Sequence, residues 1–448
     1  MIPNERTGAS RTTCAYTHGM DQEPTNNAIL STNGKPFLRR VIVNNYKSIG
    51  TCDVKMAQFT VLVGRNGAGK SNFLDALRFV TDGLLTSLDH AIKSRGGIQM
   101  VRRKSTGHPR NFSIEIEFNL SGSRLGQYGF EIAARPEGGF SVKWEKLRIM
   151  DMGFHVISSY EIEAGVLLGG SDNVAHTLVS LTMPKVVPDR LYLVVASGIP
   201  VFREAYDALT AMGFYNLNPE SMKELQSPDA GELLHRDGDN IASVIARLES
   251  EAPEDKSRVE QYLSRIVPGL EAVNRQSLGP RETVEFRQRV RDVVTGPQNE
   301  HPWRFPAASM SDGTLRALGL LVAVSQLVHL KDRVLLVGVE EPETALHPAA
   351  AKALMDALRE AQRHTQIVIT THSADLLDNM GSAPEGLLAV QSKAGETQIA
   401  PIDLASRKAV KEHLYTAGEM LRMDQLEPDQ SELQRQQDSL FGNSETNQ

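Results

Sequence analysis

The chain has 448 residues, and its 48 Lys and Arg against 55 Asp and Glu give a formal net charge of −7. This length predicts two or three structural units, and the acidic balance excludes a generally basic nucleic-acid coat protein. The cysteines, Cys14 and Cys52, are too few for a disulfide framework or a cysteine-rich zinc site. No stretch reaches the ~18 apolar residues of a membrane span, and we expect a soluble, cytoplasmic protein without a signal peptide.

Residues 1–36 are polar and lack apolar periodicity, so we expect a disordered leader there. Strands are predicted from Phe37, first in the alternating stretch FLRRVIVNNYKSIG and then in the apolar run FTVLVG at 59–64. Helical spacing follows in NFLDALRFV, and NFSIEIEFNL, YGFEIAA and FSVKWEKLRIM alternate as strands do. Residues 37–200 are therefore assigned to an N-terminal lobe.

The following hundred residues, 201–300, change to helical periodicity in pieces such as IASVIARLESEA and SRVEQYLSRIV, interrupted by prolines. We predict a mainly helical insertion there. Residues 301–424 return to alternating helices and strands, which indicates a C-terminal lobe of an α/β core that the insertion splits. Residues 425–448 are rich in Gln, Ser and Glu and are expected to form a disordered tail.

The sequence GRNGAGKS satisfies the phosphate-loop pattern G-x-x-x-x-G-K-[ST]. An apolar strand precedes it and an amphipathic helix follows, so backbone N–H groups and a helix N-terminus can surround phosphates. Lys70 is expected to reach the β- and γ-phosphates of ATP, and the Ser71 hydroxyl to bind Mg²⁺. The residues predicted to contact the nucleotide here are Asn66, Gly67, Ala68, Gly69, Lys70 and Ser71.

Two adjacent glutamates, Glu340 and Glu341, end the apolar run of VLLVGVEEPETALHP. Neighbouring anions at the mouth of a core repel each other, and burial disfavours ionisation of either one, so cations are expected nearby. Lys70 and Mg²⁺ would supply them. We predict that Glu340 holds Mg²⁺ through water and that Glu341 is the base that orients and deprotonates the attacking water.

Two further motifs carry polar groups suited to the same nucleotide. The apolar strand QIVITTH ends at His372, where a neutral imidazole can donate a hydrogen bond to the γ-phosphate. The segment SMSDGTLRALGL is a polar turn that opens a long apolar helix, and Ser311 fits its N-cap. A helix N-terminus with a serine hydroxyl and Gly313 is also an anion site.

Taken in order, the phosphate loop, SDGT, VLLVGVEEPETALHP and IVITTHS resemble the motifs of ABC-type ATPase heads of the RecF, SMC and OLD group. The resemblance spans nearly all of residues 37–424, and it is closest to the RecF-like and OLD-like ATPases of bacteria in NNYKSIG, VGRNGAGKSNFLDALRF and EEPETALHP. It implies an α/β fold: a P-loop NTPase head with a mixed sheet, flanking helices and a helical insertion.

The resemblance also implies a head-to-tail homodimer, with two ATP molecules between the phosphate loop of one subunit and the signature turn of the other. Ser311 and Gly313 would then bind the γ-phosphate in trans. The turn departs from the usual signature at Asp312 and Thr314, and His347 stands where Asp is common in the next loop.

Two other positions depart from the family pattern or stay open. Glu340 stands where Asp is more usual for metal binding. For the glutamine of the Q-loop, Gln99 and Gln127 both remain candidates.

OLD-type nucleases carry a metal-binding TOPRIM domain with a D-x-D pair after the ATPase. The segment after His372 is short for such a domain and has no D-x-D, while Asp237 and Asp239 fit a turn before a helix. We therefore expect no nuclease in this chain. Basic clusters that leave DNA contact open are Arg102 to Arg110 and the series Arg281, Arg287, Arg289 and Arg291.

These features together favour an ATP-hydrolysing switch that closes as a dimer. By analogy with nuclease-less OLD-like ATPases, we expect the ATPase subunit of a bacterial anti-phage defence system that regulates a separate nuclease effector. The alternatives are a DNA-repair or recombination clamp that grips DNA itself, and an ATP-gated scaffold with little turnover.

Overall fold

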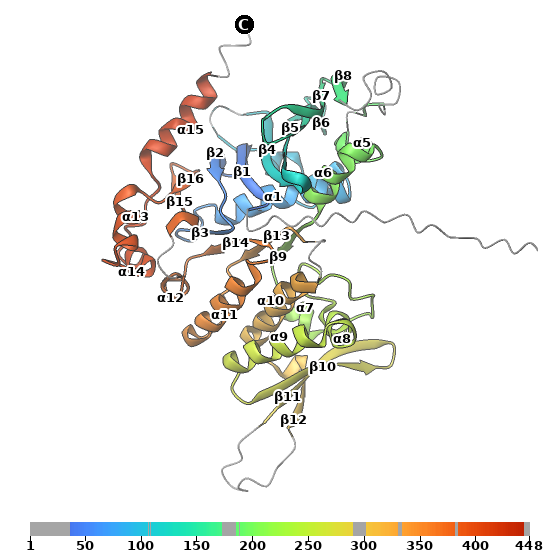
Figure 1. Cartoon of the computed structure of the whole chain (residues 1–448), viewed down its shortest axis with the longest axis vertical. Coiled ribbons are helices and arrows are strands. Elements are labelled where there is room, and N and C mark those ends of the chain that lie inside the picture. Colours follow the sequence, from blue (N-terminus) through green and yellow to red (C-terminus); the bar gives the residue numbers. More distant parts are fainter. Residues whose placement is uncertain are drawn as a thin grey trace, which may run out of the picture.

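The computed structural model describes residues 36–442 except 106, 108, 173–184, 188, 290–301, 330–333 and 381–383. Almost all of the predicted leader, residues 1–36, therefore lies outside the described residues. The described part contains one large mixed sheet and a smaller three-stranded sheet, each with helices packed against it (Figure 1).

The centre of the large sheet is parallel and buried. Its strands run β15-β3-β14-β13-β9 in space, so segments far apart in sequence become neighbours. Strands that are covered on both faces need apolar side chains throughout, which explains the runs FTVLV and QIVITT. The bounds are β3 (Phe59–Val63), β9 (Met212–Tyr215), β13 (Leu336–Glu340), β14 (Gln366–Thr371) and β15 (Leu387–Lys393).

The remaining strands form an antiparallel arm, in the order β8-β7-β6-β5-β4-β1-β2, which joins the centre through β16 (Glu396–Pro401). The alternating segments recognised in the sequence lie in this arm. Tyr46, Phe79 and Phe112 meet edge to face in its core. The bounds are β1 (Leu38–Tyr46), β2 (Ile49–Lys55), β4 (Asn111–Leu120), β5 (Arg124–Ala134), β6 (Phe140–Met150), β7 (Val156–Glu163) and β8 (Val166–Asp172).

Helices beside the arm position the phosphate loop. The longest, α1 (Lys70–Leu85), starts directly after the loop and packs against α6 (Pro200–Thr210). Its buried side chains, which include Phe73, Leu77 and Val80, follow the helical spacing seen in the sequence. Shorter elements nearby are α2 (Leu88–Lys93), α3 (Ile98–Val101), α5 (Leu193–Ala196) and the 3₁₀ turn Ser121–Ser123.

Residues 201–300 contain more strand than the sequence predicts. Strand β9 belongs to the large sheet, and β10 (Leu270–Leu278) and β11 (Arg281–Gln288) form the small sheet with β12 (Trp303–Pro306). Their sequences carry too many charges to show a clear strand pattern. The helices here are α7 (Pro219–Lys223), α8 (Ile241–Glu251) and α9 (Pro253–Ile266), and α9 packs on α10 (Asp312–His329) and α11 (Pro348–Ala361).

The expected disordered tail, residues 425–448, is in fact helical over α15 (Gln430–Gly442). The side chain of Gln436 is buried and donates from Nε2 to the carbonyls of Asp53 and Ile399, both at 3.0 Å. These tertiary contacts stabilise a helix that the polar composition of the segment does not predict. Before it come the 3₁₀ turn Pro384–Gly386, α12 (Ala374–Asp378), α13 (Leu404–Lys411) and α14 (Ala417–Arg422).

None of the helices in the described part of the chain combines the length and apolarity that crossing a membrane requires.

Candidate nucleotide-binding site

The phosphate loop leads from β3 into α1, as the sequence predicts. Gly69 precedes the helix with φ 105°, a left-handed conformation that favours glycine. A Cβ at this position would lie 2.0 Å from Thr397 Oγ1, so the position needs glycine for space as well. The Lys70 ammonium donates to the carbonyls of Gly64 at 2.8 Å and Arg65 at 3.1 Å. Lys70 thus folds back over the loop where a phosphate would lie.

A chain of polar contacts supports the loop from below. Asn72 Nδ2 donates to Ser48 Oγ at 2.6 Å, Ser48 and Thr397 share a hydroxyl contact of 2.7 Å, and Thr397 Oγ1 donates to the Ala68 carbonyl at 2.9 Å. These residues come from the β1–β2 turn, α1 and β16. Three elements therefore hold the loop in place. The side chains of Asn66 and Ser71 are exposed.

A cavity of about 320 Å³ opens beside the loop. Its walls include Gly64 to Ala68, Val390 to Ser392 of β15 and the end of α14 with the segment after it. Arg65 forms an exposed ion pair with Asp424 across this opening. The loop is thus accessible to a ligand from solvent.

The acidic segment lies at the carboxyl end of β13, where the sequence places it. Because β3, β14 and β13 are adjacent and parallel, their carboxyl ends meet at one edge of the sheet. Glu341 leaves the strand with φ 43°, and its N–H donates to the Thr370 carbonyl at 3.0 Å. This left-handed turn separates the Glu340 and Glu341 side chains, which then take different partners.

Each carboxylate has its own positive or polar neighbour. Glu340 Oε1 lies 3.9 Å from Nη2 of Arg236, and Glu341 Oε1 lies 3.3 Å from Nδ1 of His372. Burial lowers the pKa of Lys70 below its ordinary value, because it outweighs the negative charges of Glu341 and Glu343, which raise the pKa. The expected cation Lys70 is therefore electrostatically coupled to this edge, and Arg236 is a second cation that the sequence did not indicate.

Glu343 is a third carboxylate of the site, and the sequence reasoning missed it. Its Oε1 accepts from Thr371 Oγ1 at 2.5 Å and from the His372 N–H at 3.3 Å. Its Oε2 is buried and has no hydrogen-bond partner among the described residues. Within EEPETALHP the only available signal was a third acidic residue two positions after Glu341.

His372 follows β14, as predicted, and is partly exposed. Its Nδ1 lies within 3.9 Å of Glu343 as well as near Glu341. The structure thus brings together Lys70, Glu341 and His372, with Glu340 at the end of the same strand. A neutral imidazole held by these carboxylates can present its other nitrogen to a ligand.

The donor set fits a magnesium ion that is bound mainly through a nucleotide. The Ser71 hydroxyl and the Glu340 carboxylate are hard oxygen ligands, and Glu343 Oε2 is a buried acceptor that has no hydrogen-bond partner among the described residues. No cluster of three or more His, Cys, Asp or Glu in the described residues is arranged to hold a metal alone. Such a site would use phosphate oxygens and water for the remaining positions.

The signature turn opens the long helix α10. Ser311 Oγ accepts from the Thr314 N–H at 3.2 Å, so the predicted N-cap is present. A Cβ on Gly313 would lie 2.2 Å from the Ala345 carbonyl, which packs the turn against the loop after Glu341. Asp312 pairs with Lys223 at 2.7 Å. No hydrogen bond or ion pair among the described residues joins Ser311 or Gly313 to residues 64–71.

Neither Q-loop candidate lies at the acidic edge. Gln99 accepts from Arg102 in the short helix α3, and Gln127 lies inside β5 of the antiparallel arm. The residue that follows β9, beside the end of β13, is Asn216, because Tyr215 pairs with Val339. By this backbone register, the residue level with Glu340 is an asparagine and not a glutamine.

The remaining sequence candidates are engaged in local contacts. Asp239 pairs with His235 at 2.6 Å in a turn before α8, in keeping with the turn interpretation. Arg103 pairs with Glu396, Arg287 with Glu285, and Arg289 with Glu271. Arg291 lies outside the described residues. These ion pairs neutralise part of both basic clusters.

The fold and the site define a P-loop ATPase of the ABC type. A solved structure described as the SmcHead bound to the C-winged helix domain of ScpA has the same fold, with a TM-score of 0.50 and 15% identity over 83% of this chain and 99% of that one. An SMC head with an extended coiled coil, derived from Pyrococcus furiosus, matches with a TM-score of 0.45 and 14% identity over 85% of this chain and 99% of that one.

More specifically, the chain belongs to the family described as "AAA domain, putative AbiEii toxin, Type IV TA system", which matches residues 59–149 and 218–378. Among curated proteins, ABC transporter A family members 3 and 5 of Arabidopsis thaliana are 38% and 37% identical over 87 residues, 18% of this chain. The match spans only 9% of either transporter. The expected ABC-type ATPase head is therefore confirmed, and an ATPase domain of this kind implies ATP binding.

Proposed function

We propose that this protein is an ATP-hydrolysing dimeric switch of the RecF and OLD type. The observation that carries the proposal is the meeting of Lys70, Glu341, Glu343 and His372 at the carboxyl ends of three adjacent parallel strands. In this site Lys70 and the loop amides bind the phosphates of ATP, with Mg²⁺ held by Ser71 and by Glu340 through water. Glu341 orients and deprotonates the attacking water, and His372 contacts the γ-phosphate.

Among the described residues the signature turn makes no hydrogen bond or ion pair with the phosphate loop, which is compatible with a dimer. Gly313 packs against the Ala345 carbonyl in the loop after Glu341, and a second subunit would bring its signature turn to each bound ATP. ATP then closes the homodimer, and hydrolysis opens it.

For the biological role, we propose the ATPase subunit of a bacterial anti-phage defence system that controls a separate nuclease. The family description, which names a putative toxin of a toxin–antitoxin system, is compatible with an ATPase that controls a toxic activity. The SmcHead of the same fold is bound to the C-winged helix domain of ScpA, so a head of this fold can carry a partner protein. A clamp that grips DNA directly is the second candidate, although ion pairs with carboxylates neutralise Arg103, Arg287 and Arg289 of the two basic clusters.

The proposal is tested by ATP turnover and by nucleotide-dependent dimerisation. Glu341→Gln should lower kcat by roughly 10²–10⁴-fold while leaving ATP binding intact, because the amide keeps the shape but cannot accept the proton. The dimer should accumulate with Mg²⁺ and ATP, as measured by light scattering. Lys70→Ala should instead weaken nucleotide binding itself. Turnover by Glu341→Gln within a few-fold of wild type would remove Glu341 as the base.

A further inference from the structure

Arg236 reaches the acidic edge from the insertion, more than a hundred residues before Glu340 in the sequence. Its Nη2 lies 3.9 Å from Glu340 Oε1, and 45% of its side chain is exposed. Arg236 and Glu340 also line one small cavity together with Asp75 and Arg78 of α1. A cation from the insertion therefore sits against the carboxylate that the proposed function assigns to Mg²⁺.

The turn that carries Arg236 is fixed to the strand beside Glu340. The Asn216 N–H donates to the Arg236 carbonyl, and the Asn218 N–H to the Asp237 carbonyl, both at 3.0 Å. Asn216 directly follows β9, whose Tyr215 pairs with Val339 of β13. A movement of the Arg236 side chain therefore acts on a segment bonded to the sheet at the site itself.

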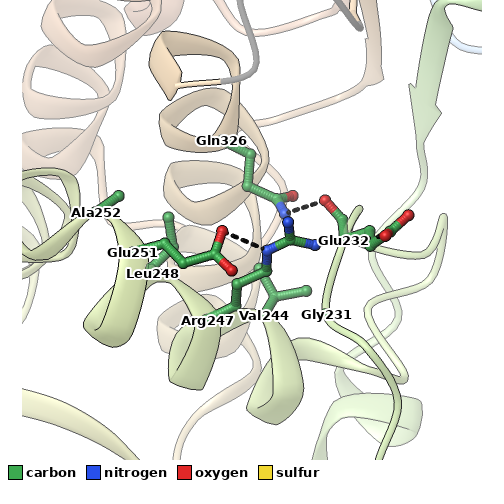
Figure 2. Close-up of a pocket in the computed structure, with 8 residues that line it drawn as sticks. All are labelled: Gly231, Glu232, Val244, Arg247, Leu248, Glu251, Ala252 and Gln326. Atoms are coloured by element: carbon green, nitrogen blue, oxygen red, sulfur yellow. Dashed lines mark hydrogen bonds and ion pairs between the residues drawn. The ribbon is translucent and has the colours of Figure 1, made fainter. Parts of the chain in front are cut away.

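The same turn is hydrogen-bonded at its other end to α10, the helix that the signature turn opens. The Leu234 N–H donates to Gln326 Oε1 at 2.9 Å, and Gln326 Nε2 donates to the Glu232 carbonyl at 3.3 Å. Figure 2 shows Gln326 reaching from α10 toward Glu232, with the second of these bonds dashed. Because Gln326 is only 4% exposed, breaking either bond leaves a buried polar atom unsatisfied. Residues 232–240 thus connect Glu340 to the helix that begins at the signature.

We propose that Arg236 is the counter-ion of Glu340 in the absence of metal and that it moves away from Glu340 when Mg²⁺ binds with the nucleotide. Residues 232–240 then transmit the presence of the metal to α10. The inference rests on the proposed function, because it takes Glu340 as the Mg²⁺ position. A guanidinium and a divalent cation repel each other when they share one carboxylate, so the two states of Arg236 differ in free energy. Metal binding therefore favours the state in which Arg236 has left Glu340. A ligand can drive a conformational change only when it interacts differently with the two states, and the metal does so here.

The first measurement is metal affinity. Mn²⁺, a paramagnetic substitute for Mg²⁺, is titrated against the full chain with AMP-PNP and followed by electron paramagnetic resonance. Arg236→Gln should bind Mn²⁺ about fivefold more tightly than wild type. This is the low end of the coupling between two sites in proteins, because solvent screens a half-exposed side chain. Arg236→Lys, which keeps the charge, should stay near wild type. Arg265→Gln is the matched control, since this exposed insertion arginine stacks on Tyr262 in α9.

The second measurement is amide hydrogen exchange of residues 216–240 and of α10 with AMP-PNP, with and without Mg²⁺. In wild type and Arg265→Gln the metal should change exchange in both segments, and in Arg236→Gln this response should be lost. If wild type binds the metal–nucleotide complex but Arg236→Gln matches Arg265→Gln in both readouts, the counter-ion role is wrong and the proposed function stands. If wild type binds no nucleotide at all, the proposed function fails and the inference fails with it.

Discussion

Glu343 holds the end of β14 in place with one oxygen and has no partner for the other. A buried, unsatisfied carboxylate oxygen is costly, and such atoms cluster where a ligand, ion or water completes the site. Because Glu343 also bonds the His372 N–H, it sets where the imidazole stands relative to Glu341. We interpret it as a positioning residue for His372 and for the field around Lys70.

Glu343→Gln should therefore impair turnover more than binding. The amide of glutamine is a weaker acceptor for the Thr371 hydroxyl and the His372 N–H, so we expect kcat to fall about tenfold with KM nearly unchanged. Steady-state kinetics gives the two values. Glu385→Gln, at an exposed carboxylate in the turn before β15, is the control. Equal losses in Glu343→Gln and in this control would contradict a positioning role.

Asp75 gives a pH-dependent prediction on the helix of the phosphate loop. Burial raises the pKa of its carboxyl, but Arg95 and Lys47 outweigh burial and lower the pKa from 3.8 to about 2. Since the folded pKa is depressed, the stabilisation is present above pH ~4 and is lost as pH falls toward ~2. It amounts to about 2 kcal/mol.

The test compares wild type with Asp75→Asn in urea unfolding between pH 5 and pH 2.5. The free-energy difference between the two should shrink as the pH falls, because the Asp75 carboxyl binds a proton in the unfolded wild type at a higher pH than in the folded one. A difference that stays constant over this range would show that Asp75 does not titrate as described.

At the scale of elements, the proposed dimer completes each ATP site with the signature turn at the start of the partner's α10. Mixing Lys70→Ala chains with Ser311→Arg chains should therefore restore ATPase activity, because a heterodimer contains one interface without either substitution. Activity of the mixture is compared with that of each variant alone and with wild type diluted by either one. A mixture no more active than its components would argue against signature residues acting in trans.

How far the sequence predicts each element depends on what stabilises it. The strands around the phosphate loop were predictable because burial on both faces imposes apolar runs, and the motifs at their ends placed Lys70, Glu341 and His372. The small sheet was not predictable from the sequence, because β11 (RETVEFRQ) mixes charged residues with its buried ones. Helix α15 and the contacts of Glu343 and Arg236 depend on residues distant in sequence, which local patterns cannot show.

At the scale of the whole molecule, the proposed function assigns nuclease activity to a separate effector protein. We therefore expect the purified chain with Mg²⁺ and ATP to leave plasmid and linear DNA intact in a gel assay, including the Glu341→Gln dimer. Metal-dependent cleavage that is lost when Asp237 and Asp239 become alanine, but survives in Glu341→Gln, would overturn this expectation and assign the nuclease to this chain.

The strand order also constrains how the protein is made on the ribosome. Strand β3 is completed early in synthesis, yet its two neighbours in the sheet, β14 and β15, are some three hundred residues later in the chain. At about 5–20 residues per second, the nascent phosphate loop waits on the order of 15–60 s for the strands that enclose it. During that interval an apolar strand edge is open to other chains, so the cell has to shield it until translation is nearly finished.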